Sequence, residues 1–152
     1  MRESRMSGSV RGVLSNGCLY RDPSILRGGT PGLLLQAARE RRVDLFTSTA
    51  MLAELTDILG RRKFDKKIAA SGVTIDQLVD GYAQLAALVH PTTVQRIAPD
   101  PDEDVVIGTA VSANAEFIVT GDKPLLTVSE FQGVKVIGVA HAVALVDAES
   151  QA

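Results

Sequence analysis

The sequence predicts an α/β protein in which helices cover both faces of a mostly parallel sheet. Short apolar, β-branched runs alternate with amphipathic stretches from Thr30 onward, and this alternation is typical of parallel strands joined by crossover helices. The chain has 152 residues, of which 45% are hydrophobic. This is enough for one domain with a full core and too short for two ordinary ones. We therefore expect residues 1–152 to form a single domain, with an atypical N-terminal segment at residues 1–27.

The first half of the predicted domain is mainly helical. Thr30 is suited to cap a helix that has Pro31 at its first position. Leu45–Phe46 fits a short buried strand. Apolar residues then recur at helical spacing over Met51–Leu59, and Gly60 ends this helix.

The second half continues with two clear helices. Thr74–Val89 is amphipathic and is stopped by Pro91. Asp100, Pro101 and Glu103 follow the order N-cap, first helical residue and third helical residue, so a helix begins there. The other predicted features are a strand at Val94–Ile97, an end of this helix near Asn114, a strand at Phe117–Val119, a helical turn at Pro124–Leu126, a strand at Val134–Ile137 and a helix at Val139–Val146.

The segment before the first helix fits a central strand poorly. Gly12, Asn16, Gly17, Arg21 and Pro23 all disfavour a buried parallel strand. This segment is therefore locally inconsistent with the rest of the chain.

Composition excludes several classes of function. Tryptophan is absent and 4% of the residues are aromatic, so a platform that stacks single-stranded bases is not expected. The formal net charge of −2 leaves only local binding to nucleic acid. Cys18 is the only cysteine, which excludes an internal disulfide and a cysteine zinc site. No apolar run approaches a membrane span or a signal-peptide core, so we expect a cytoplasmic protein with no membrane partner.

Several familiar motifs are also absent from the sequence. It has no GxSxG, GxGxxG or Walker pattern. His90 and His141 lack a cysteine, aspartate or serine partner at useful spacing, and we expect both to be structural. The basic stretch Arg61–Lys67 is either a solvated surface or a local footprint for a phosphate backbone.

Three acidic residues stand out by their positions. Glu54 lies at the edge of the apolar arc of its helix, Asp104 directly precedes Val105–Ile107, and Asp122 follows the strand Phe117–Val119. Carboxylates at the carboxyl edge of a parallel sheet can hold Mg²⁺ or Mn²⁺ against a phosphodiester. Each acid also has an ordinary explanation, as a boundary glutamate, a helix-start acid favoured by the helix dipole, or a turn cap.

The order of these motifs resembles that of PIN-domain nucleases, in particular the toxin components of bacterial toxin–antitoxin pairs. The similar region runs from about Gly28 to Gly138 and includes GGTPGLLL, LFTSTAMLAEL, RRKF, DPDEDVVIGTAV and AEFIVTGDKPLL. The resemblance implies a three-layer α/β/α sandwich with a central, mostly parallel sheet and an acidic metal pocket. It also implies metal-dependent cleavage of single-stranded or structured RNA, by homodimers that a cognate antitoxin protein silences.

The resemblance also implies roles for individual residues. Glu54, Asp104 and Asp122 take the positions of the acids that bind Mg²⁺ or Mn²⁺. Thr120 takes the position of an accessory group near the phosphate or a metal-bound water. A divalent ion in such a pocket lowers the pKa of water and neutralises charge on the phosphate. Asp102 is either an outer-shell acid or part of the helix-start chemistry.

One position departs from the family. Its members open with a hydrophobic strand that ends in an Asp-Thr-Asn step, whose aspartate is the first metal ligand. In register with Val13-Leu14 this aspartate falls on Ser15, a poor ligand for a hard divalent ion. Asp22 follows several residues too late. We therefore expect the fold of the family with weakened metal binding and cleavage. A local frame change over about Gly17–Ser24 is one hypothesis for the departure, and the coding DNA tests it.

Three functions compete at this point. The first is a metal-dependent endoribonuclease toxin that acts through Glu54, Asp104 and Asp122. The second is a catalytically impaired PIN domain that binds RNA or a partner protein, for example an antitoxin segment docked in the cleft. The third is an unrelated flavodoxin-like binding domain, in which the three acids point away from one another.

Overall fold

The structure is a computed structural model, and it describes residues 10–16, 30–61, 65–72, 74–92 and 101–151. Several sequence predictions lie outside these residues: Asp22, the frame change over Gly17–Ser24, the strand at Val94–Ile97 and the N-cap Asp100. Among the residues that are described, no helix combines the length and the hydropathy that a membrane crossing needs.

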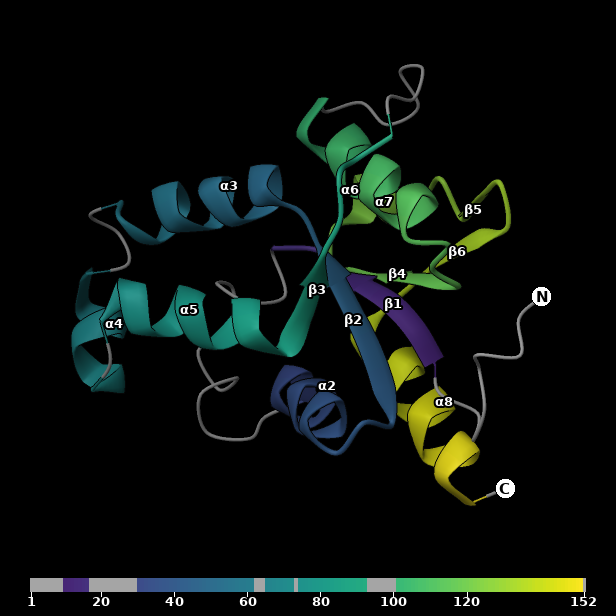
Figure 1. The fold of residues 1–152 in the computed structure, drawn as a ribbon, viewed down its shortest axis with the longest axis horizontal. Helices are drawn as coiled ribbons and strands as arrows, with labels where there is room; N and C mark the ends of the chain where they lie inside the picture. Colours follow the sequence, from purple (N-terminus) through teal and green to yellow (C-terminus); the bar gives the residue numbers. More distant parts are fainter. Residues whose placement is uncertain (1–9, 17–29, 62–64, 73, 93–100, 152) are drawn as a thin grey trace.

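A six-stranded sheet forms the centre of the fold (Figure 1). Its strands are β1 (Val10–Leu14), β2 (Val43–Thr47), β3 (Ala86–Leu88), β4 (Phe117–Val119), β5 (Glu130–Phe131) and β6 (Val134–Ile137). The strand order is β3-β2-β1-β4-β6-β5, and all neighbouring strands run parallel except β5 and β6. The mostly parallel sheet that the sequence predicts is confirmed.

Helices cover both faces of this sheet. They are α2 (Thr30–Arg39), α3 (Thr49–Leu59), α4 (Asp65–Ser71), α5 (Ile75–Leu85), α6 (Pro101–Ser112), α7 (Lys123–Leu126) and α8 (Val139–Gln151). One hydrophobic cluster joins α2, α3, α5 and α8 to one sheet face, and a second joins α3, α6 and α7 to the other. In Figure 1, α2 and α8 lie on one side of the sheet and α6 and α7 on the other. The predicted three-layer α/β/α arrangement is therefore confirmed.

Strand β1 lies in the middle of the sheet, between β2 and β4. The expectation that this segment makes a poor central strand is wrong for residues 10–14. The strand ends at Leu14, so Asn16 does not have to adopt a strand conformation. Gly12 suits its place because a Cβ there would lie 3.3 Å from the carbonyl oxygen of Phe117 on β4.

A second difference concerns the helix predicted at Thr74–Val89. Helix α5 begins with a capping box between Thr74 and Gln77, but it ends at Leu85, and the chain continues as β3. This strand pairs with β2 at the edge of the sheet. The apolar and alanine residues over 85–89 continue a helical pattern as well as they form a strand, so periodicity alone does not reveal the switch.

The other predicted elements within the described residues are present close to their expected bounds. Helix α6 begins at Pro101 and ends at Ser112 rather than Asn114. Helix α8 continues to Gln151 rather than ending at Val146. The edge strand β5 is not predicted, because two residues are too few to show a period.

Candidate active site at the carboxyl edge of the sheet

Buried polar side chains gather where the central strands end. Ser15 and Asn16 follow β1, Thr47 ends β2 and Ser48 follows it, and Thr120 follows β4. Each of the five is at most 4% exposed. Because these strands run parallel, their carboxyl ends share one edge of the sheet. Burying polar groups is unfavourable unless they are hydrogen-bonded, and open α/β sheets bind ligands at this edge.

Asn16 joins the end of β1 to helix α3. Its Nδ2 donates to Oε1 of Glu54 and to the carbonyl oxygen of Met51, each at 2.8 Å. Asn16 is 4% exposed, so the hydrogen bond to Met51 is buried and the one to the half-buried Glu54 is partly shielded from water. Its Oδ1 is buried and has no hydrogen-bond partner in the part of the chain that is described. Glu54 is half-buried and is held toward the end of β1, as its position at the edge of the apolar arc predicts.

Ser15 joins β1 to the end of β4. Its hydroxyl donates to Oγ1 of Thr120 at 3.0 Å, and its backbone N–H donates to the carbonyl oxygen of Val119 at 2.9 Å. Oγ1 of Thr120 also accepts a hydrogen bond from the backbone N–H of Asp122 at 3.0 Å. The Thr120 side chain is 0% exposed. In this structure Thr120 therefore supports the turn that carries Asp122.

Ser48 and Thr109 tie helix α3 to helix α6. Ser48 is the N-cap of α3, and its Oγ accepts a hydrogen bond from the backbone N–H of Met51 at 3.3 Å. The hydroxyl of Thr109 lies 3.2 Å from Oγ of Ser48 and 2.8 Å from the carbonyl oxygen of Val105. These contacts set the second half of α6, the helix that carries Asp104 in its first half, against the beginning of α3.

Helix α6 also contacts the segment that follows β3. The backbone N–H of Thr92 donates to the carbonyl oxygen of Gly108 at 3.0 Å. A Cβ built at Gly108 would overlap the carbonyl oxygen of Thr92. This position therefore needs glycine because the two backbones approach closely.

The topology brings the carriers of the three predicted acids to one edge, but the described side chains do not form a closed ligand set. Glu54 lies on α3, Asp104 on α6 and Asp122 just after β4, and each is half-buried. Among the described residues, no group of three or more His, Cys, Asp or Glu side chains is placed to hold a metal ion. The side chain of Asp102 lies outside the description.

The carboxylates at this edge are ligands of the type that a divalent cation accepts while it keeps most of its own water. Mg²⁺ is usually bound by one or two carboxylates together with waters and substrate phosphates. The hydrogen bond from Asn16 to Glu54 is of the kind that orients a ligating carboxylate. Ser15 does not fit, because its hydroxyl is neutral and donates to Thr120. Carboxylates of this kind could hold a hydrated divalent cation through one or two ligands, whereas the described side chains do not form a cage made by protein alone.

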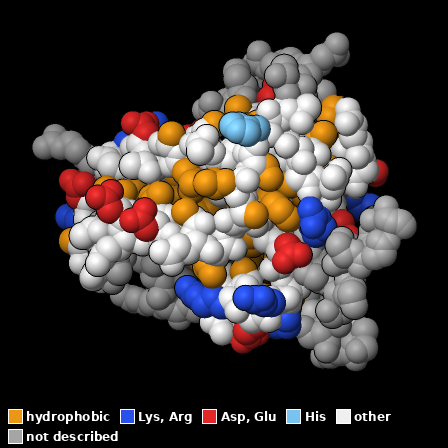
Figure 2. All heavy atoms as spheres, viewed as in Figure 1, with side chains coloured by type: hydrophobic (Ala, Val, Ile, Leu, Met, Phe, Trp, Pro, Cys, Tyr) orange, Lys and Arg blue, Asp and Glu red, His pale blue; other side chains and the backbone are white. Residues whose placement is uncertain are grey.

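Charged residues outside the carboxyl edge of the sheet have no single sign (Figure 2). His90 and His141 are exposed. Arg61 is exposed and pairs with Asp57 at 3.4 Å, and residues 62–64 lie outside the description, so a phosphate footprint here stays a prediction. Figure 2 shows acidic side chains on the left of the molecule, basic ones at the bottom and apolar ones across the centre. Binding of nucleic acid would have to be local, as the net charge predicts.

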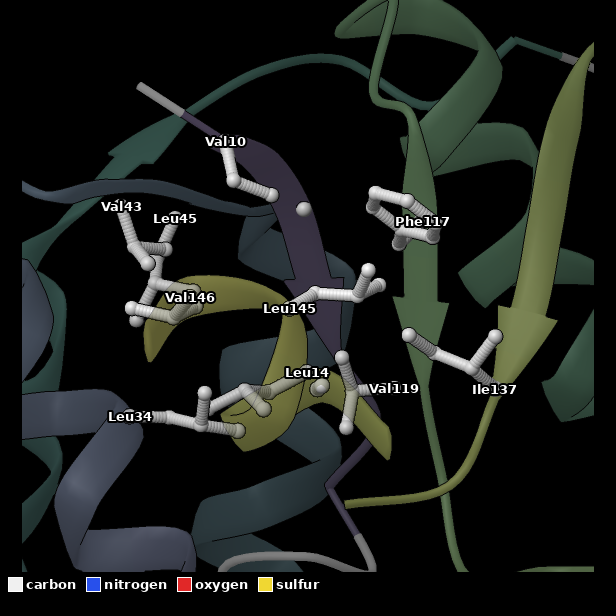
Figure 3. Close-up of a pocket in the computed structure, with 12 residues that line it drawn as sticks. Val10, Leu14, Leu34, Val43, Leu45, Phe117, Val119, Ile137, Leu145 and Val146 are labelled. Carbon is white, nitrogen blue, oxygen red and sulfur yellow. The ribbon is translucent and has the colours of Figure 1, made fainter. Parts of the chain in front are cut away.

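An apolar pocket lies between the sheet and helices α2 and α8 (Figure 3). Its lining includes Leu14 and Val119 from the strands, Leu34 from α2 and Leu145 from α8. Every lining residue is apolar or glycine, so the pocket offers no side chain that could bind a charged ligand. It belongs to the first hydrophobic cluster rather than to the acidic edge.

Three residues that organise this edge are not predicted from the sequence as residues of the site. Asn16 counts there only as a residue that disfavours a strand, although its place directly after an apolar strand is a usable signal. Ser48 precedes a helix, which is the signal of an N-cap. Thr109 carries no signal, because its partner Ser48 is 61 residues away in the chain.

The chain was also compared with known proteins. It matches the family model described as PIN domain over residues 12–124. The matched region begins in β1 and ends in α7, so it includes Ser15 and all the predicted acids. No curated protein and no solved structure matches the chain.

Proposed function

The chain belongs to the PIN domain family, and on that basis we propose that it is an endoribonuclease that uses Mg²⁺ or Mn²⁺. PIN domains are generally nucleases. The observation that carries the proposal is the line of contacts across the end of β1. Asn16 is bonded to Glu54 at 2.8 Å, and Ser15 is bonded to Thr120 at 3.0 Å. This line links the helix of one predicted acid to the turn that carries Asp122.

The residues of this edge have two kinds of role, which are to hold the cation and to position the side chains that hold it. Glu54, Asp104 and Asp122 would hold the cation. A bound divalent cation supplies an activated water and offsets charge on the phosphate. Asn16 orients the carboxylate of Glu54, and Thr120 holds the backbone of Asp122 through the hydrogen bond at 3.0 Å.

The biological setting is a finer part of the proposal. We infer that the chain is the toxin component of a toxin–antitoxin pair, acts as a homodimer in the cytoplasm, and is silenced by a cognate antitoxin protein. The support is the resemblance of its motifs to those of the PIN-family toxins, from about Gly28 to Gly138.

Cleavage of RNA by the purified chain tests the proposal. Single-stranded and hairpin RNA are incubated with Mn²⁺ or with EDTA, and DNA of the same sequence is the control. We expect slow cleavage that needs the metal, is restricted to RNA and is lost in Asp104→Asn. Cleavage that persists in EDTA or in Asp104→Asn contradicts it.

The residue at position 15 should determine how fast the chain cleaves RNA. Ser15→Asp adds a carboxylate where the family has its first ligand, so cleavage should become roughly tenfold faster or more, the scale on which a metal site responds to a changed partner. Ser15→Asn is the matched control, because it adds similar bulk without charge. Equal rates in the starting chain and in Ser15→Asp contradict the proposal.

A second function is favoured by the incomplete ligand set. Ser15 is neutral, and the described residues contain no group of three acids placed for a metal. A PIN domain that binds RNA or a partner protein without cleaving it is consistent with both observations. Absent Mn²⁺ binding together with retained RNA binding would select this function.

A further inference from the structure

We propose that Asn16 is a positioning residue, which holds the Glu54 carboxylate in the orientation that a divalent cation needs. The inference rests on the proposed function. It concerns a residue adjacent to the position where this chain lacks the first ligand of the family.

The backbone of α3 decides how the Asn16 amide is turned. The carbonyl oxygen of Met51 can only accept a hydrogen bond, and it lies 2.8 Å from Nδ2 of Asn16. The NH₂ group must therefore face α3, and its second proton reaches Oε1 of Glu54 at 2.8 Å. The hydrogen bond to Met51 thus ensures that the NH₂ group of Asn16, and not its oxygen, faces the carboxylate of Glu54.

The burial of Asn16 strengthens its hydrogen bond to Glu54. Asn16 is 4% exposed and its bond to Glu54 is partly buried, and a hydrogen bond that is partly shielded from water is electrostatically stronger than one fully in water. Glu54 has a long, flexible side chain, and ordering such a chain costs conformational entropy. Because Asn16 orders it when the protein folds, that cost does not have to be met when a cation binds.

The other end of the amide indicates that Asn16 is not there for stability alone. Its Oδ1 is buried and has no hydrogen-bond partner within the described part of the chain. A buried acceptor without a partner is unfavourable, and an apolar residue of similar size would avoid it. Asn16 is better explained by what its NH₂ group does for Glu54.

Binding of Mn²⁺, followed by water-proton relaxation, tests the role of Asn16. Loss of a partner that orients a ligand usually weakens metal binding 10- to 100-fold, so Asn16→Ala should raise the Kd for Mn²⁺ by about that factor. Thr56→Val is the matched control. Thr56 lies on the same helix as Glu54 but is exposed, and its hydroxyl donates only to the carbonyl oxygen of Leu52, at 2.9 Å, among the described contacts, so this variant should leave the Kd unchanged.

A double-mutant cycle separates positioning from simple destabilisation. If Asn16 acts through Glu54, Asn16→Ala should have no further effect on the Kd in a Glu54→Gln background. Circular dichroism confirms that each variant is folded at the temperature used. An unchanged Kd in folded Asn16→Ala overturns the inference, and so does a further loss of binding in the Glu54→Gln background.

A measurement without metal keeps the two proposals distinguishable. The side-chain NH₂ signals of Asn16 in an NMR spectrum should be protected from solvent exchange and should shift in Glu54→Gln. Signals that exchange as fast as those of an exposed asparagine overturn the inference, even where Mn²⁺ binds. A starting chain that shows no saturable Mn²⁺ binding overturns the proposed function instead.

Discussion

Ser15 and Asn16 follow the central strand directly, and each forms a hydrogen bond with a different neighbour. Ser15 donates to Thr120 after β4, and Asn16 donates to Glu54 on α3. Neither residue is charged, so neither needs a cation to be stable when buried. Neither position therefore carries a charge that a metal would have to offset, and the consequence is a weaker attraction for metal.

Ser15→Asp should increase the attraction for metal and lower the stability of the metal-free protein. A carboxylate that is buried without a cation is unfavourable, so the free energy of unfolding in EDTA should fall by about 1–3 kcal/mol. Mn²⁺ should restore much of the loss, because a ligand that binds the folded state stabilises it. Urea unfolding with and without Mn²⁺ measures both effects. Equal stability of the variant and the starting chain in EDTA would contradict this account.

Gly108 is a second position where one residue decides the packing. A Cβ there would overlap the carbonyl oxygen of Thr92, so Gly108→Ala should lower the free energy of unfolding by about 1–3 kcal/mol. Gly81 on α5 is the control, since a Cβ built there meets no atom within 4 Å. Gly81→Ala should raise stability by about 0.5–1 kcal/mol, because alanine is the better helix former. Urea unfolding should show opposite signs for the two variants.

Glu40 provides a pH-dependent test outside the site. Hydrogen bonds from Gln36 at 3.0 Å and from Arg42 at 2.9 Å hold the pKa of Glu40 below its ordinary value of 4.5. A lowered pKa in the folded state contributes stability above the unfolded pKa, and this stability is lost as the pH falls through the folded value. An NMR titration should place the pKa of Glu40 below 4.5 and closer to 4.5 in Gln36→Ala. An unchanged pKa in Gln36→Ala would contradict this assignment.

At the scale of elements, the helices that carry Glu54 and Asp104 can be predicted from the sequence, but their contact cannot. The apolar spacing of α3 and the start of α6 at Pro101 are local features. The hydroxyls of Ser48 and Thr109 that bring these helices together are far apart in the chain. Strand β3 is missed for a related reason, because its pairing with β2, rather than its own residues, makes it a strand.

The contact between α3 and α6 predicts different outcomes for two N-caps. Ser48→Ala and Thr74→Ala each remove a side-chain cap, so each should cost about 1 kcal/mol of the free energy of unfolding. Ser48 also contacts Thr109, so only Ser48→Ala should raise the Kd for Mn²⁺. Thermal unfolding and a Mn²⁺ titration compare the two variants. Equal Kd values in both would show that the contact does not support the site.

At the scale of the whole molecule, the alternation of strands and helices predicts the layers, because each sheet face must be covered by helices. The two hydrophobic clusters confirm this arrangement. The position of the site follows from the same rule, since parallel strands end at one edge. The identity of its polar supports does not follow, because each depends on a hydrogen bond between segments far apart in the chain.

The central claim is that Glu54, Asp104 and Asp122 together bind a divalent cation at this edge. The most direct measurement is the Mn²⁺ affinity of the starting chain and of Glu54→Gln, Asp104→Asn and Asp122→Asn, each confirmed to be folded. We predict saturable binding in the starting chain and a loss of affinity in each of the three variants. No binding in the starting chain, or the same affinity in all four proteins, would contradict the claim.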